Sequence, residues 1–115
     1  RDGPWLAVGA SGGRRITNAV CQIISKMVGH GMGPQAAINA PRVDCSTPRT
    51  SVSVELDEAV RAALEERGHR LTVMGPDYAI TGFAKFGSPV AIVKPPNGDL
   101  TAGVDTFHAA YAEGY

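Results

Sequence analysis

With 115 residues and a mass of 12.0 kDa, the chain has the size of one ordinary domain. Hydrophobic residues make up 43% of it and charged residues 19%, a balance typical of globular rather than disordered proteins. Eleven basic and eleven acidic residues cancel, so the basic surface that nucleic acids and anionic membranes select is not expected. No apolar run reaches the roughly 18 residues of a membrane-spanning helix, so no membrane segment is predicted. We expect a single domain over residues 1–115.

The first part of the sequence predicts a strand, a glycine loop and two helices. Apolar residues 5–8 predict the strand, and the glycine loop, defined as residues 9–13 (Gly-Ala-Ser-Gly-Gly), follows it. Apolar side chains then recur at helical spacing over residues 16–28 and stop at two glycines. Pro34 suits the first position of a short second helix, which ends near residue 40 because a proline follows there.

The middle of the sequence predicts a strand, a helix and another strand. Residues 52–54 alternate apolar and polar side chains, as a half-buried strand does. Residues 56–64 return to helical spacing, with acidic residues in the first turn and Gly68 after the last. Residues 71–73 alternate again and predict a strand that the Gly-Pro-Asp sequence at 75–77 ends.

The last part of the sequence predicts strands only. Ile80 and Phe83 indicate more strand, and residues 90–93 predict a strand that the Pro-Pro-Asn-Gly turn joins to residues 100–104 as a hairpin. This mixed order predicts an α+β fold in which helices cover a sheet. Because the chain holds few strands, we expect it to form one part of a larger sheet.

The glycine loop is the sharpest chemical feature of the sequence. Gly12 and Gly13 lack side chains and stand where the free backbone N–H groups of the following helix begin. Such donors can hold the oxyanion of a tetrahedral intermediate, which is worth about 3 kcal/mol per donor. The alternative is a tight strand-to-helix connection that only requires positive φ angles.

Several short motifs follow one another in a characteristic order and spacing. They are Asp2-Gly3, the glycine loop with Arg14-Arg15-Ile16, Gly31-Met32, Ala40-Pro41-Arg42, Glu55, Leu64 through Gly68-His69, and Gly114-Tyr115. Together they resemble the gamma-glutamyltransferase family over nearly all 115 positions. The resemblance implies the N-terminal-nucleophile (Ntn) hydrolase fold, an αββα sandwich of two sheets between helical layers. We therefore expect this α+β chain to be the C-terminal part of the family's small subunit.

The resemblance also implies a chemistry and a set of partners. Family members cleave themselves into a large and a small subunit, and the new N-terminal threonine attacks gamma-glutamyl amides with its own amine as base. Water or an acceptor amine then resolves the gamma-glutamyl enzyme, and no cofactor is implied. The partners implied are the remainder of the small subunit, the large subunit and a small gamma-glutamyl substrate. Bacterial members are often exported, which suggests a periplasmic or secreted protein.

Carried over residue by residue, only Gly12 and Gly13 fall on catalytic positions of the family, namely its oxyanion hole. The nucleophile does not carry over, because the chain begins with Arg1 and its threonines, from Thr17 to Thr106, are internal. We expect the chain to have been cut from a longer protein and to be inactive alone.

Two departures from the family pattern stand out, one that bears on the geometry of the glycine loop and one that bears on acceptor or substrate preference. The family's Gly-Ser-Pro-Gly-Gly is Gly-Ala-Ser-Gly-Gly here, so the proline that stiffens the loop is replaced. The family's Asp-Pro-Arg becomes Asp105-Thr106-Phe107, which lacks the charged partner. The pattern therefore leaves open a related acylase of other amides, including glutaryl side chains of the cephalosporin type. A noncatalytic structural α+β module is the further alternative.

Three histidines could serve structure or chemistry. His30 and His69 each follow a glycine near a helix end, where an imidazolium favours the negative end of the helix dipole, and no metal site is predicted around them. The structural role is the expectation for both. His108 follows Asp105 by three residues, and a catalytic pair there is the alternative.

The two cysteines and one arginine complete the candidates. Cys21 and Cys45 are too few for a disulfide framework, and we expect buried free thiols, although a single bridge stays geometrically open. Arg42 could bind a carboxylate through its planar guanidinium, and an ion pair that fixes the corner after the second helix is the favoured use.

Overall fold

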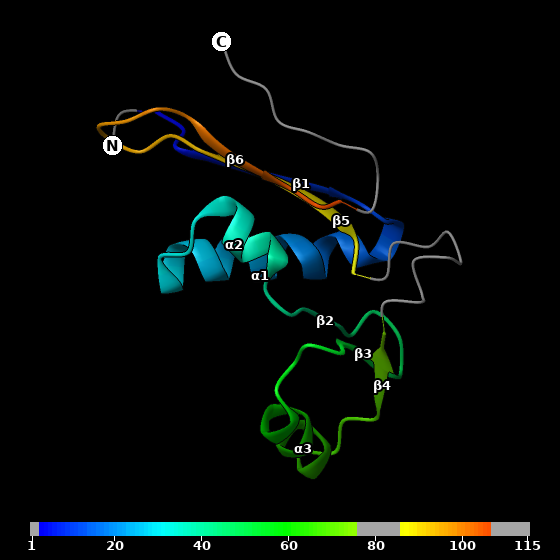
Figure 1. Ribbon diagram of the computed structural model, residues 1–115. Helices are drawn as coiled ribbons and strands as arrows, with labels where there is room; N and C mark the ends of the chain where they lie inside the picture. The colour runs from blue at the N-terminus through cyan, green and yellow to red at the C-terminus, as the bar shows by residue number, and fades with distance from the viewer. Residues whose placement is uncertain (1–2, 76–85, 107–115) are drawn as a thin grey trace.

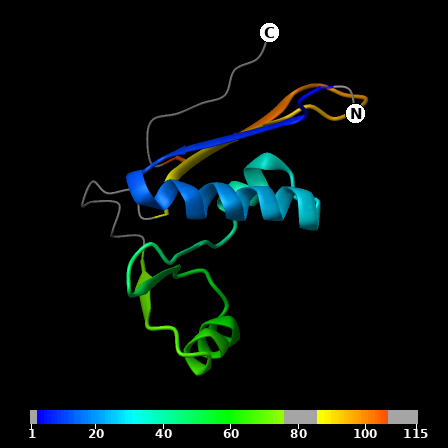
Figure 2. The same ribbon diagram turned by 180° about the vertical axis from the view of Figure 1, so that it is seen from behind.

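Two three-stranded sheets and three α-helices make up residues 3–75 and 86–106, the part of the chain that the computed structural model describes. The first sheet has the order β1-β5-β6, with strands β1 (Leu6–Ser11), β5 (Ser88–Val93) and β6 (Thr101–Val104). Helices α1 (Ile16–His30) and α2 (Pro34–Asn39) lie on one face of this sheet, as both views show (Figures 1 and 2). The second sheet and helix α3 lie beyond α1, on the side away from the first sheet.

The first sheet is antiparallel throughout. Strand β1 pairs with β5 from Leu6 opposite Val93 to Ser11 opposite Ser88, and β5 pairs with β6. The predicted C-terminal hairpin is therefore confirmed. The predicted first strand is present but longer than expected, because residues 9–11 of the glycine loop pair with β5 and belong to β1. Strand β5 is the central strand of this sheet. It pairs with β1 on one side and with β6 on the other, so strands from distant parts of the sequence form one sheet.

One face of the first sheet carries the core. The core cluster consists of five buried residues from α1, α2 and β5: Ile23, Met27, Ala37, Ile38 and Ala91. On β5 the neighbours of Ala91 point the other way, and Val90 and Ile92 are 44% and 46% exposed. This alternation leaves the second face of the sheet apolar and uncovered by the described residues.

Helix boundaries follow the predicted signals. Helix α1 ends at Gly31, whose φ of 66° is the left-handed conformation that favours glycine at this position. Helix α2 begins at Pro34 and ends before Pro41, as predicted. No helix of the described residues is both long and apolar enough to cross a membrane.

The second sheet contains β2 (Val43–Asp44), β3 (Thr50–Ser53) and β4 (Leu71–Met74). Strands β3 and β4 are parallel, and α3 (Glu58–Glu66) forms the crossover that parallel strands need. The sequence predicts β3, α3 and β4 and misses β2, which pairs antiparallel with β3. The strand expected around Ile80 and Phe83 lies outside the described residues.

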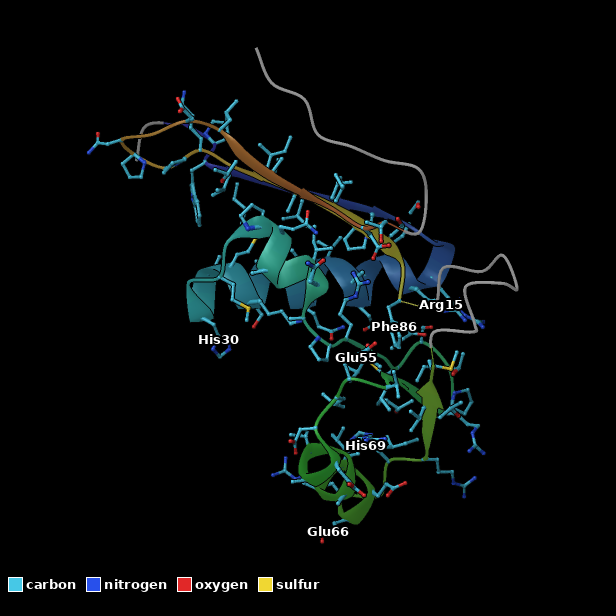
Figure 3. The ribbon with its side chains drawn as sticks, viewed as in Figure 1. Arg15, His30, Glu55, Glu66, His69 and Phe86 are labelled. Carbon is cyan, nitrogen blue, oxygen red and sulfur yellow. The ribbon has the colours of Figure 1, made fainter. Side chains whose placement is uncertain are left out.

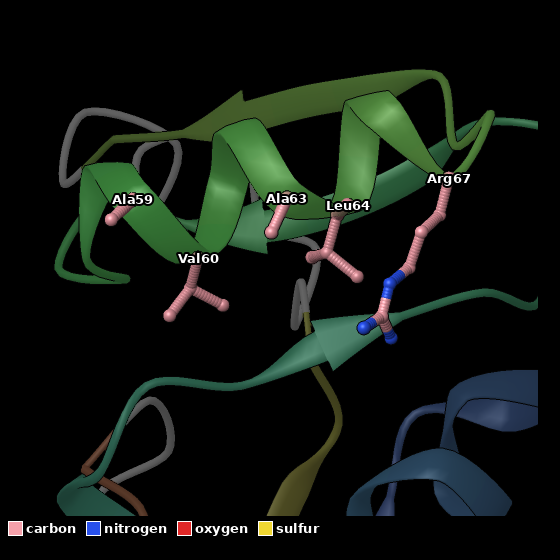
Figure 4. A pocket seen from close by; sticks show the side chains of 5 residues that line it. All are labelled: Ala59, Val60, Ala63, Leu64 and Arg67. Atoms are coloured by element: carbon pink, nitrogen blue, oxygen red, sulfur yellow. The ribbon is translucent and has the colours of Figure 1, made fainter.

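Helix α3 is capped but sparsely packed. The Asp57 side chain accepts a hydrogen bond of 2.8 Å from the Ala59 N–H, as an N-cap residue does. None of the helix residues is buried. Its apolar side lines an open hollow on the surface, shown in Figure 4 and formed by Ala59, Val60, Ala63, Leu64 and Arg67.

Gly103 lets β6 approach α2 closely. A Cβ atom at this position would lie 2.5 Å from the Gln35 nitrogen and 2.6 Å from the Pro34 carbonyl carbon. Both are backbone atoms, so a side chain would push the strand and the helix apart. We expect Gly103→Ala to lower the free energy of unfolding by about 2 kcal/mol.

The measurement for this prediction is the chemical denaturation of full-length protein carrying Gly103→Ala or Gly29→Ala. Gly29 lies in α1, where a Cβ atom would meet nothing within 4 Å, so alanine there is expected to be neutral or slightly stabilising. Equal unfolding free energies for the two variants would contradict the close approach of β6 and α2.

Candidate active site

The glycine loop ends in two glycines with positive φ. Gly12 has φ of 131° and Gly13 of 62°, and Gly13 begins a 3-10 turn (Gly13–Arg15) that leads into α1. Residues that have a side chain rarely adopt such φ angles. The two glycines therefore form the tight strand-to-helix connection with positive φ that was predicted from the sequence. Within residues 3–75 and 86–106, neither the Gly12 nor the Gly13 N–H donates a hydrogen bond. Two backbone donors therefore stand side by side at the N-terminal end of α1.

The loop rests against the chain segment that enters β5. A Cβ atom on Gly12 would lie 2.9 Å from the Cα of Gly87, closer than real Cβ atoms approach. Gly87 itself has φ of 69°. Gly87 also lies close to the turn before α1, because a Cβ atom there would be 3.7 Å from the Arg15 carbonyl oxygen. The position of the loop thus depends on a residue more than seventy positions away, a contact that no sequence motif indicates.

A buried carboxylate holds the turn that follows the loop. Asp44 is 1% exposed, and its Oδ2 accepts from the Arg15 Nε at 3.3 Å. Its Oδ1 accepts from the Asn18 Nδ2 at 2.8 Å, and the Ser46 hydroxyl donates to Oδ2 at 2.9 Å. The second sheet is therefore tied to the first turns of α1 through one carboxylate.

The charge on Asp44 is stabilised in spite of its burial. Desolvation alone would raise the pKa of this carboxyl, because burial penalises the charged form. The hydrogen bonds from Asn18 and Ser46 and the charge of Arg15 outweigh that effect and lower the pKa below its ordinary value.

One polar side of α1 holds the segment from residue 40 to 46. The Gln22 side chain accepts from the Val43 N–H at 2.9 Å and donates to the Val43 carbonyl at 2.7 Å. The Lys26 Nζ donates to the carbonyls of Ala40 and Pro41 at 3.2 and 2.8 Å. Burial and the nearby Arg42 charge lower the pKa of Lys26. These contacts supply partners for β2, a strand too short to be predicted from a pattern.

Arg42 forms the predicted ion pair. Its Nη2 lies 2.6 Å from the Asp105 Oδ2, and the two side chains are only 11% and 14% exposed. The pair connects the corner after α2 to the end of β6, so the corner-fixing role is confirmed. The alternative of a catalytic Asp105–His108 pair cannot be placed, since His108 lies outside the described residues.

The other histidines lie at helix ends, as predicted. His30 is the last residue of α1, and the His69 N–H donates to the Leu64 carbonyl at 3.1 Å just after α3. Figure 3 shows them on separate parts of the molecule. In the described part of the chain, no three His, Cys, Asp or Glu side chains are grouped as metal ligands.

Both cysteines are free, as expected, but the prediction that they are buried is wrong. Cys21 is exposed because it lies about 200° around α1 from the buried Ile23, on the outer side of the helix. Cys45 is exposed in the loop after β2, with its Sγ 3.4 Å from the Asn18 Oδ1.

Comparison with known proteins decides the family. The family model for gamma-glutamyltranspeptidase matches residues 1–115. The chain belongs to this family. Among curated relatives, the Acylase ACY 1 proenzyme of Pseudomonas sp. (strain SE83) is 33% identical over 102 residues, which cover 76% of this chain and 18% of the proenzyme. The chain thus spans less than a fifth of that relative's length.

Solved structures of two kinds of enzyme share the fold of this chain. The gamma-glutamyltranspeptidase from Pseudomonas nitroreducens complexed with L-DON superposes with a TM-score of 0.77 at 21% identity, covering 100% of this chain and 58% of that one. The cephalosporin acylase from Bacillus halodurans gives 0.76 at 26% identity, covering 94% and 20% of the two chains. The chain is therefore a mixed α+β fragment that matches these Ntn-hydrolase structures, which confirms the expected α+β class.

Proposed function

We propose that the chain is the C-terminal part of the small subunit of a self-cleaving enzyme that hydrolyses gamma-glutamyl amides, such as glutathione, or transfers their gamma-glutamyl group. The Gly12 and Gly13 N–H groups are its oxyanion donors. The observation that carries this proposal is the pair of adjacent N–H groups at the start of α1 that have no acceptor among the described residues. The match of the gamma-glutamyltranspeptidase family over residues 1–115 supports the chemistry.

The reaction assigns a defined task to these two donors. A threonine hydroxyl outside the 115 residues attacks the amide carbonyl, and its own amine takes the proton. The carbonyl oxygen becomes negative, and the two N–H groups stabilise it by about 3 kcal/mol each. When the amide nitrogen leaves with a proton, an ester remains on the threonine. Water or an acceptor amine then attacks the ester and regenerates the hydroxyl.

The apolar outer face of the first sheet fits a larger assembly. Val90 and Ile92 are 44% and 46% exposed, and apolar side chains gathered on one face of a sheet usually pack against another layer. In the proposed αββα sandwich, the remainder of the small subunit and the large subunit supply that layer. The proposed reaction requires no cofactor.

A second candidate is an acylase that cleaves a glutaryl or similar amide. The identity of 33% to the Acylase ACY 1 proenzyme favours it, as does Asp105-Thr106-Phe107 where gamma-glutamyltransferases have Asp-Pro-Arg. Without this arginine, a charged partner for a substrate group is missing. We therefore expect this difference to affect substrate preference more than any other property.

The test is hydrolysis of gamma-glutamyl and glutaryl anilides by the purified full-length protein, with self-cleavage followed by gel electrophoresis. A variant with alanine at the residue after the cleavage point is the control, and it should neither cleave nor react. Turnover of the gamma-glutamyl anilide supports the first candidate, and turnover of only the glutaryl anilide supports the second. A wild-type protein that does not cleave itself would favour the noncatalytic module.

A further inference from the structure

Gly87 lies in a tight space between the two elements that flank the glycine loop. A Cβ atom at Gly87 would lie 3.2 Å from the Ala19 Cβ in α1 and 3.2 Å from the Ser11 carbonyl oxygen at the end of β1. It would also lie 3.7 Å from the carbonyl oxygen of Arg15. From the opposite direction, the Gly87 Cα is the atom that a Cβ on Gly12 would strike at 2.9 Å. Gly87 therefore contacts the end of β1, the loop and the start of α1 together.

We propose that Gly87 is a positioning residue for the oxyanion donors, acting through Gly12. This inference rests on the proposed function of the Gly12 and Gly13 N–H groups. Its physical basis is that the absence of a side chain at Gly87 allows the loop to lie directly on the backbone that enters β5. A side chain at Gly87 would push away either the end of β1 or the start of α1. Because Gly12 and Gly13 lie between these two elements, a shift of either one changes the direction in which the two N–H groups point.

The expected consequence is a change in turnover and not in substrate affinity. Oxyanion donors act on the negative charge that develops in the transition state, so their misplacement lowers kcat more than it raises KM. A displacement of about 1 Å can cost roughly a hundredfold in rate. A role in folding alone would lower the amount of active enzyme and leave kcat per active site unchanged.

The chain contains a matched control for the backbone strain. Gly31 has φ of 66°, close to the 69° of Gly87, but a Cβ atom there meets nothing within 4 Å. Alanine at either position has to adopt the same unfavourable conformation. Only Gly87→Ala adds the contacts with β1 and α1, so the difference between the two variants isolates those contacts.

The experiment compares wild-type full-length protein, Gly87→Ala and Gly31→Ala by steady-state kinetics with whichever anilide the wild type hydrolyses. Rates are divided by the concentration of self-cleaved enzyme. We expect Gly87→Ala to lower kcat roughly tenfold to a hundredfold, with KM within about twofold of wild type, while Gly31→Ala keeps kcat. Equal kcat values for the two variants, or a change confined to KM, would overturn the inference and leave the proposed function standing. An inactive wild type would instead refute the proposed function, and the inference with it.

A second pair of variants decides the matter if Gly87→Ala does not fold or cleave. Ala19→Ser enlarges the side chain that faces Gly87 without changing a glycine, and Ala37→Ser makes the same change at an equally buried helical alanine in α2. A several-fold lower kcat for Ala19→Ser alone supports the positioning role. The same kcat in both serine variants counts against it.

Discussion

Under the proposed function, replacing Gly12 with alanine is expected to lower kcat for anilide hydrolysis by the full-length protein roughly a hundredfold to a thousandfold, the loss typical of one oxyanion donor. Two features of this position add together. Its φ of 131° is a conformation that alanine rarely adopts, and the new Cβ would lie 2.9 Å from the Gly87 Cα. The loop has to move for the side chain to fit, and its N–H groups move with it.

Gly13→Ala is the internal comparison for this prediction. Gly13 has φ of 62°, inside the left-handed region, and nothing lies within 4 Å of a Cβ atom there. Alanine costs about 1 kcal/mol of strain at such a position and meets no neighbour, so we expect a loss of kcat of about tenfold or less. Steady-state kinetics of the two variants, corrected for the fraction of self-cleaved protein, provide the measurement. Similar kcat values for both variants would contradict the idea that the close approach of Gly12 to Gly87 determines the geometry of the loop.

The sequence predicts those elements whose pattern extends over many residues. Helix α1 repeats an apolar side chain every three or four positions, and its predicted end at the glycines agrees with the left-handed Gly31. Strand β2 contains two residues, too few to show a period, and it depends on Gln22 for its hydrogen bonds. Local pattern therefore defines α1, whereas tertiary contacts define β2.

The candidate site likewise contains residues that a local sequence pattern predicts and residues that only tertiary contacts define. Gly12 and Gly13 are evident from sequence because two adjacent glycines before a helix form a local signal. Gly87 gives no such signal, because its role comes from contacts with residues on β1 and α1. The exposure of Cys21 could have been predicted from the helical period. Ile23 belongs to the buried side of α1, and a residue two positions away points to the opposite side of the helix.

The burial of Asp44 also escapes sequence analysis, although one clue exists. Arg15, Asn18, Gln22 and Lys26 recur every three or four residues and therefore lie along one side of α1. Such a polar stripe beside an apolar one indicates a polar partner. Which residue that partner is follows only from the fold, because Asp44 lies 29 positions from Arg15 and 26 from Asn18.

Replacing Asp44 with alanine is expected to lower the free energy of unfolding by about 3 kcal/mol at neutral pH. The substitution removes the carboxylate that accepts hydrogen bonds from the Arg15 guanidinium and the Asn18 amide. Breaking a buried charge pair from one side is costly for this reason, although Arg15, with 24% of its side chain exposed, can recover part of the loss from water. Hydrogen exchange of α1 and β2 in the full-length protein measures the effect locally, and unchanged protection there would contradict it.

The same carboxylate gives a pH dependence whose direction is defined. Because the pKa of Asp44 is lowered in the fold, its ionised form contributes stability that is complete above its ordinary value of 3.8 and is lost as the pH falls through the folded value. Asp44→Asn keeps the size of the side chain and removes this titration. We therefore expect wild type to exceed Asp44→Asn in hydrogen-exchange protection of α1 by a constant amount at neutral pH, and by a shrinking amount below pH 3.8. A difference that is the same at neutral and acid pH would show that the charge of Asp44 does not stabilise the turn after the glycine loop.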